Sequence, residues 1–325
     1  MLKSKKSLVT FEHNGQRFDI VAAELFKEMS RKKIKAIIDS GGAYINKRRV
    51  IVAKTVVKTG DKIEIFWEEN AQSLSNASKQ SVTSVNKTLG TYISKETCVF
   101  ENEDFFIINK PAGISSQATL TSDKDSIIFS LNKFDPNKFN LKKMFLVHRL
   151  DKETSGLMII AKNQNSQKIF EDLFRDKKIN KTYDAICYFA PKNLEGEINF
   201  PIAKDNTRKN CYFAVTNIKS KIKDQKQAST YYKVTKIFKN NEASLMRCNP
   251  KTGRTHQIRV HLSAIGCPLL GDKTYSQNIY GHRFSQLAIR HMLHASELEF
   301  EVNGKIFHFT SNLPEDFERI IKTLE

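Results

Sequence analysis

Residues 147–157 read Val-His-Arg-Leu-Asp-Lys-Glu-Thr-Ser-Gly-Leu and join two apolar runs, Phe145–Val147 and Leu157–Ala161. The two runs predict strands, and Thr154-Ser155-Gly156 supplies the turn residues of the loop between them. This loop carries Asp151, and a rigid scaffold often presents a reactive group on such a loop. On the local pattern alone, a solvated acid in a strand connection is the more common outcome, so the role of Asp151 depends on the rest of the chain.

The composition favours a polyanionic partner. The chain has 325 residues, with 53 Lys and Arg against 35 Asp and Glu, which gives a formal charge of +18. This length is enough for two domains, and the positive charge favours nucleic acid and, less often, an anionic membrane surface. No apolar run approaches the roughly 20 residues of a spanning helix, and residues 11–17 are polar where a signal peptide would be apolar. We therefore expect no association with a membrane.

Cysteine and histidine spacing argues against disulfides and metal. The five cysteines are scattered and never form Cys-x-x-Cys, which fits a reducing compartment and predicts a cytoplasmic protein. His256 and His261 share a segment, but a spacing of five residues does not place them on one helix face. We expect these two histidines to face RNA or to pack in the core, and we predict no metal site.

An N-terminal domain is predicted at residues 1–68. Apolar residues recur at helical spacing over 18–29, and Ser30 is a typical N-cap for a second helix that Gly41-Gly42 would end. Short apolar segments at 43–45 and 50–52 follow, and residues 62–66 alternate as a strand.

The second helix of this domain begins with cations. They are Arg31, Lys32, Lys33 and Lys35. Cations at a helix N-terminus oppose the macrodipole, so an external anion is a natural partner, although an ordinary solvated face has the same composition. The segment resembles the S4 RNA-binding domain in Arg17-Phe18-Asp19, Ser30-Arg31, residues 42–46 and Gly60-Asp61, with Lys47 where that family usually has Gly. The resemblance implies that these four cations bind RNA.

Two further segments follow this domain. Residues 69–90 are rich in Ser, Asn, Gln, Thr and Lys without a period, and predict a flexible linker that would let the basic domain hold RNA near the second part. Residues 91–325 mix strands, hairpins and helices, which predicts an α+β domain with a largely antiparallel mixed sheet flanked by helices. The clearest signals are a hairpin at 231–248, a helix at 258–265 and the Asn303-Gly304 turn.

Four motifs of this second part resemble the RluA-type pseudouridine synthases, in that family's order. They are residues 148–157 (HRLD through SGL), Asn109 to Gly113 (NKPAG), Lys181 to Ala185 (KTYDA), and Thr252 to Leu262 (TGRTHQIRVHL) followed by Gly271-Asp272 and Leu293-His294-Ala295. The resemblance covers roughly residues 91–302, and the S4-like domain precedes it as in the ribosomal members.

This resemblance implies isomerisation of uridine to pseudouridine in RNA. Asp151 would be the nucleophile or base, and Arg259 would pair with it and keep it ionised. Tyr183 would stack on the uracil, and Arg149 would fill the space that the flipped base leaves. Lys110 and Pro111 look structural. The remaining residues expected to contact substrate are His148, Leu150, Thr154 and Arg254.

Substrate and product are isomers, so the reaction implied by the resemblance needs no cofactor and no metal. The S4-like domain favours 23S ribosomal RNA or a pre-ribosomal particle as partner of a monomeric enzyme, and tRNA is the alternative substrate. Two other functions stay open. An RNA-binding protein without catalysis would be expected to have lost Asp151, Tyr183 or Arg259. A hydrolase of N-glycosidic bonds would usually require a second carboxylate, and Glu153 is the only acid close in sequence.

Overall fold

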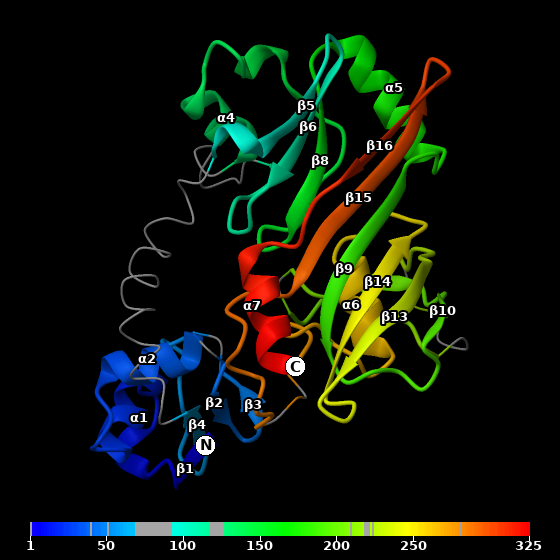
Figure 1. The fold of residues 1–325 in the computed structure, drawn as a ribbon. Helices are drawn as coiled ribbons and strands as arrows, with labels where there is room; N and C mark the ends of the chain where they lie inside the picture. Colours follow the sequence, from blue (N-terminus) through cyan, green and yellow to red (C-terminus); the bar gives the residue numbers. More distant parts are fainter. Residues whose placement is uncertain are drawn as a thin grey trace. The chain divides into compact units, whose positions relative to one another are not determined.

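The computed structural model describes residues 2–39, 41–50, 52–68, 93–117, 126–208, 210–217, 222, 224–277, 279 and 281–325. Its contacts divide the chain into two compact units (Figure 1). The first unit is Met1–Gln80 with Pro268–Met292, and the second is Ser81–Cys267 with Leu293–Glu325. The linker predicted at 69–90 lies outside the described residues.

The first unit is a small sheet with two helices. The sheet has the order β1-β4-β2-β3, and a core of Val, Ile, Phe and Met side chains lies between it and the helices. The elements are β1 (Leu2–Leu8), α1 (Phe18–Leu25), α2 (Arg31–Asp39), β2 (Ala43–Ile45), β3 (Arg48–Arg49) and β4 (Lys62–Glu68).

Local sequence explains most boundaries of this unit. Ser30 Oγ accepts a hydrogen bond from Lys33 N (3.2 Å), as an N-cap does, and Gly41 follows α2 with a φ of +80°. Asn46 and Lys47 both have positive φ and form the two-residue turn between β2 and β3. Such a turn requires positive φ at both central positions, so Lys47 adopts the conformation for which Gly is usual.

One prediction for this unit needs correction, and one strand was not predicted. The first helix ends at Leu25 instead of near residue 29, because Phe26 and Met29 reach the core from a turn in which Met29 N donates to Phe26 O (2.7 Å). The strand β1 was not predicted from the basic N-terminal sequence, yet it pairs with β4 along all seven of its residues.

Pro268–Met292 also belongs to the first unit by its contacts, although the sequence prediction placed these residues in the catalytic domain. The side chain of Arg49 holds this segment. Its guanidinium is buried and donates to Gly41 O (2.9 Å), Ser276 Oγ (3.2 Å) and Ser285 O (3.1 Å). Three acceptors around one buried cation fix the segment against the small sheet.

The second unit is built on a ten-stranded sheet with the order β10-β13-β14-β9-β15-β8-β6-β5, in which β16 pairs with β15 and β7 with β8. Only the pairing of β15 with β8 is parallel among the described strands of this sheet. The predicted α+β class with a largely antiparallel mixed sheet is therefore confirmed. The strands are β5 (Cys98–Glu101), β6 (Phe105–Lys110), β7 (Phe145–Leu146), β8 (Ser155–Ala161), β9 (Asn180–Tyr188), β10 (Glu195–Ile198), β13 (Thr230–Phe238), β14 (Ala243–Pro250), β15 (Leu293–Val302) and β16 (Lys305–Thr310).

Both faces of the sheet are covered around β6 and β8. Phe105 and Ile107 point into one core with Phe170, while Phe106 and Ile108 point into another. Because side chains alternate along a strand, the continuous apolar run of β6 serves two cores at once. The helices are α4 (Ile127–Phe134), α5 (Gln164–Arg175), α6 (Gln257–Ala264) and α7 (Glu315–Leu324).

Some elements of this unit were not predicted. They are α4, β5, β10 and the two-stranded sheet of β11 (Ile202–Lys204) and β12 (Tyr212–Ala214). These strands have only three or four residues, too few for a clear alternation.

Among the described residues, we find no helix with the length and apolar character needed to traverse a bilayer.

Candidate active site

Asp151 lies in the loop between β7 and β8, and its side chain is 18% exposed. The loop is tight, because Thr154 N donates to Asp151 O (3.0 Å) and Gly113 N donates to Lys152 O (2.7 Å). On the other side of the acid, Leu150 is buried in the core. Each neighbour of Asp151 is therefore held by the fold.

Two side chains from the end of β6 and the residues just after it hold this loop in place. Lys110 is completely buried, and its Nζ donates to Pro111 O (3.0 Å), Ile114 O (2.9 Å) and Lys152 O (3.2 Å). Ser116 Oγ donates to Leu150 O (2.7 Å) and accepts from Leu150 N (2.9 Å). A buried ammonium is tolerated when carbonyls satisfy its donors, so Lys110 has a structural role beside the acid, as expected.

The parallel pairing of β8 with β15 forms the base of the loop. Ser155 is paired with His294 and Gly156 with Ala295, and Ser155 Oγ shares a hydrogen bond with His294 Nδ1 (3.0 Å). Gly156 has a φ of +116°, and a Cβ at this position would lie 2.3 Å from Ala295 O. The close approach of the two backbones therefore requires glycine here.

Arg259 reaches Asp151 from the first turn of α6. Its Nη1 donates to Asp151 Oδ2 (3.0 Å), and the Arg259 side chain is 8% exposed. The pair is thus largely removed from water. A charge-assisted hydrogen bond in such a buried place is screened little. The predicted partnership between residues 108 positions apart is present in the structure.

His256 also faces the acid. Its Nε2 lies 3.7 Å from Asp151 Oδ2, and the side chain is 16% exposed. The sequence predicted only an RNA-facing or packing histidine at this position. A usable signal was its spacing, since His256 precedes Arg259 by three residues and shares one side of the helix start with it. His261, in contrast, is completely buried and packs, bonding Thr230 and Phe200.

Tyr183 lies on β9 between Cys248 of β14 and Ala295 of β15. Burial chiefly, and then the negative charge of Asp151, raise the pKa of the Tyr183 phenol well above its ordinary value. The phenol is therefore neutral at physiological pH and offers a ring face and an O–H group. The structure brings Tyr183, Asp151 and Arg259 into one region of the second unit.

The predicted substrate contacts divide into two groups. Arg149 and Arg254 are exposed, and Arg254 Nε donates to Gln227 O (3.0 Å). Leu150 and Thr154 are buried, and Leu150 packs in the core beside the loop.

His148 is used by the fold itself. Its Nε2 accepts from Ile159 N (2.8 Å), and its ring lies 4.7 Å from that of Phe174. Burial, with a smaller effect from Lys181, lowers the pKa of His148 to about 3, so the imidazole is neutral. Contact of His148 with substrate stays a prediction.

The cations predicted to bind RNA lie along α2 of the first unit. Lys32, Lys33 and Lys35 are exposed, and Arg31 Nη2 donates to Asp19 Oδ2 (2.9 Å). Burial acts to raise the pKa of Asp19, but hydrogen bonds from Arg31 and Arg17 outweigh it and leave this pKa below its ordinary value. Asp19 therefore compensates part of the positive charge at the helix start.

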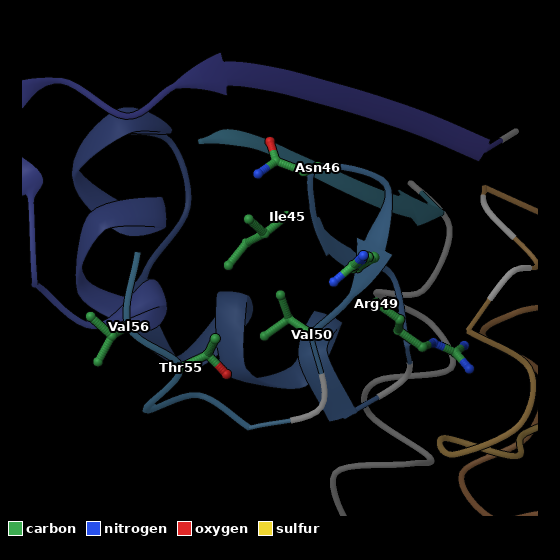
Figure 2. A pocket seen from close by; sticks show the side chains of 7 residues that line it. Ile45, Asn46, Arg49, Val50, Thr55 and Val56 are labelled. Carbon is green, nitrogen blue, oxygen red and sulfur yellow. The ribbon is translucent and has the colours of Figure 1, made fainter. Parts of the chain in front are cut away.

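A cavity of about 540 Å³ lies in the first unit (Figure 2). Ile45, Val50 and Val56 supply apolar walls, and none of the described residues that line the cavity carries a carboxylate. Among the described residues, no group of three or more His, Cys, Asp or Glu side chains is placed to hold a metal ion.

Comparison with known proteins decides the family. Residues 104–264 match the family model described as RNA pseudouridylate synthase. The chain is 32% identical over 310 residues to ribosomal large subunit pseudouridine synthase C of Rickettsia bellii, covering 94% of this chain and 97% of that protein. The chain belongs to the RNA pseudouridine synthase family. It is also 33% identical over 318 residues to ribosomal large subunit pseudouridine synthase D of Buchnera aphidicola, covering 95% and 94% of the two chains.

The pseudouridine synthase fold is also found by structure. Human RNA pseudouridylate synthase domain containing 4 matches with a TM-score of 0.57 and 24% identity, over 72% of this chain and 96% of that one. Pseudouridine synthases are isomerases, so the chain belongs to a family of enzymes. Asp151, Tyr183 and Arg259 all lie within the residues that match the family model.

Proposed function

We propose that this pseudouridine synthase isomerises uridine to pseudouridine in large-subunit ribosomal RNA. The observation that carries the proposal is the pair of Asp151 and Arg259, held 3.0 Å apart inside the family-matched segment. The names of relatives aligned over nearly their whole length support ribosomal RNA as the substrate class. The formal charge of +18 suits a polyanionic substrate.

The isomerisation exchanges one glycosidic bond for another. The N1–C1′ bond breaks, a C5–C1′ bond forms, C5 loses its proton and N1 gains one, so nothing is consumed. Asp151 is the proposed nucleophile or base on the nucleoside. Arg259 holds the carboxylate charge beside the reacting base in a site with little water.

Tyr183 and Arg149 are proposed to handle the uracil. A base must leave its stack before chemistry, and the exposed guanidinium of Arg149 can fill the vacated space and bind phosphate. The neutral Tyr183 ring would then stack on the flipped uracil. Arg254 is also exposed and is proposed to bind phosphate.

The first unit is proposed to act as an S4-like RNA-binding domain through α2. Lys32, Lys33 and Lys35 give this helix three exposed positive charges. Removal of one lysine that binds a phosphate should reduce the salt dependence of binding by roughly one unit of slope. A triple change of these lysines to serine should therefore weaken RNA binding and flatten its salt dependence. An equal reduction of charge at exposed Lys168, Lys177 and Lys178 on the second unit is the matched control.

The enzyme activity is tested by mapping pseudouridines in ribosomal RNA transcripts incubated with the protein. We expect the wild type to form new pseudouridine and Asp151→Ala to form none, with RNA affinity within a few-fold. Glu153→Ala removes a carboxylate two positions away and should stay active. If the folded wild type forms no pseudouridine in ribosomal RNA, the proposal is wrong, and product on tRNA alone would move the substrate class to tRNA.

A further inference from the structure

We propose that His256 is a positioning residue for Asp151, and the proposal rests on the function proposed above. Two side chains from the start of α6 converge on one carboxylate oxygen. Arg259 Nη1 lies 3.0 Å and His256 Nε2 lies 3.7 Å from Asp151 Oδ2. The longer distance suits an electrostatic or water-bridged contact instead of a direct hydrogen bond. Two anchors restrict rotation of the carboxylate more than one does.

The backbone at His256 is held in an uncommon conformation. His256 is the N-cap of α6 with φ 57° and ψ 20°, in the left-handed region, and its side chain makes no capping hydrogen bond. Residues other than glycine are uncommon in this region, and such conformations persist where surrounding structure imposes them. The His256 side chain does not cap the helix and instead faces the carboxylate of Asp151. We infer that its role is toward the acid and not in starting the helix.

Gln257 imposes this conformation. Its Oε1 accepts from Thr252 Oγ1 (2.6 Å) and from Arg254 N (2.9 Å), while its Nε2 donates to Ser229 O (2.9 Å) and Thr230 Oγ1 (3.0 Å). One buried side chain thus ties the loop before α6 to the sheet. The neighbouring His256 is therefore directed by a turn that has little freedom to change.

The ring of His256 is also supported. Tyr212 of β12 contacts it edge to face, with ring centroids 5.6 Å apart and an interplanar angle of 80°. Edge-to-face pairs of this kind are favourable and hold ring orientation. Asp151 and the aromatic ring of Tyr212 therefore both lie against the imidazole, and Arg259 contacts the same carboxylate oxygen. The imidazole acts on the orientation of the carboxylate and takes no part in bond making.

Two substitutions separate side-chain reach from backbone conformation. Asparagine tolerates the left-handed region well, so His256→Asn keeps the turn but ends short of Asp151 Oδ2. Glutamine places an N–H group near the position of the imidazole Nε2. We expect His256→Asn to lower kcat about 10- to 100-fold, as misplacement of a reacting group does, with KM within about twofold. His256→Gln should have a kcat much closer to that of the wild type than His256→Asn has.

Tyr212→Leu provides a second variant that leaves His256 in place. Removing the supporting ring should lower kcat by a few-fold without a matching change in KM, and circular dichroism checks that each variant is folded. The proposal is overturned if His256→Asn keeps the wild-type kcat, or if its defect appears in KM alone, which would make His256 an RNA contact. The wild type in the same assay keeps the two proposals distinct. A wild type that forms no pseudouridine removes the proposed function, whereas an active wild type with an equally active His256→Asn removes only the positioning role.

Discussion

Replacing Gly156 with alanine tests whether the contact between β8 and β15 fixes the base of the Asp151 loop. The added Cβ would lie 2.3 Å from Ala295 O and 2.5 Å from Ala295 N. These are backbone atoms of a strand paired with β8 on one side and β9 on the other, so they cannot retreat without disrupting the pairing. The overlap costs about 1–3 kcal/mol, and a side chain at φ +116° costs about 1–3 kcal/mol more.

We therefore expect Gly156→Ala to lower the free energy of unfolding by about 4 kcal/mol. Alanine has fewer conformations than glycine in the unfolded chain, and this entropic effect offsets the destabilisation by less than about 1 kcal/mol. The decrease is a large share of a typical domain stability of about 5–15 kcal/mol, so the variant should also unfold at a clearly lower urea concentration. Because the single tryptophan, Trp67, belongs to the first unit, circular dichroism is the measurement for these strands.

Gly304→Ala is the matched control. Gly304 has a φ of +73° in the turn between β15 and β16, and no atom lies within 4 Å of an added Cβ. The same substitution there should cost about 1–2 kcal/mol, the ordinary cost of a left-handed residue. If the two variants are destabilised equally, the backbone of Ala295 yields to the added methyl group and the argument for a rigid base is refuted.

Three further predictions concern buried cations and histidine. Lys110→Met leaves three carbonyls without their ammonium donor and should cost about 2–4 kcal/mol of stability, measured in urea; an unchanged midpoint would contradict the structural role. The folded pKa of His148 is about 3, below its unfolded value, so the unfolded chain binds the extra proton in acid. The contribution of His148 to the free energy of unfolding is complete above about pH 6.5 and should fall by up to about 1.4 kcal/mol per pH unit below that pH. In acid titrations, His148→Gln should not show this loss of stability. Burial lowers the pKa of Lys181 to about 8, so its unfolded form holds the proton to higher pH. Between about pH 8 and 10 the wild type should gain stability relative to Lys181→Met, and parallel curves would refute this.

Local sequence was sufficient for elements with strong periodicity. The apolar run that became β6, the hairpin of β13 and β14, and the Asn303-Gly304 turn were all predicted, because alternation and turn chemistry are local properties. The end of α1 was misplaced for the opposite reason. Phe26 and Met29 are buried by tertiary packing although they lie beyond the end of the helix. Their apolar side chains therefore continue the helical pattern in the sequence past the last helical residue.

Long-range features could not be derived from local sequence. Nothing near Arg49 indicates that its guanidinium would be buried against residues 276 and 285. The pairing of Asp151 with Arg259 was expected only through the resemblance to a known family, since 108 residues separate them. Helix periodicity treats His256 as one more polar residue. It gives no sign of the left-handed backbone at His256 or of the four hydrogen bonds that Gln257 makes beside it.

The placement of the acid therefore depends on residues that carry no chemistry of their own. Asp151 is held through Lys110 at the end of β6, through Gly156 against β15, and through the start of α6. Each of these three supports contacts the loop through backbone atoms or through one carboxylate oxygen. A shift of any one support therefore displaces the carboxylate, even though the residues next to Asp151 in the sequence are unchanged. A pseudouridine synthase could keep Asp151, Tyr183 and Arg259 and still be inactive if Lys110 or Gly156 changed. The motif residues identify the reaction, and the supporting contacts determine whether a given chain can perform it.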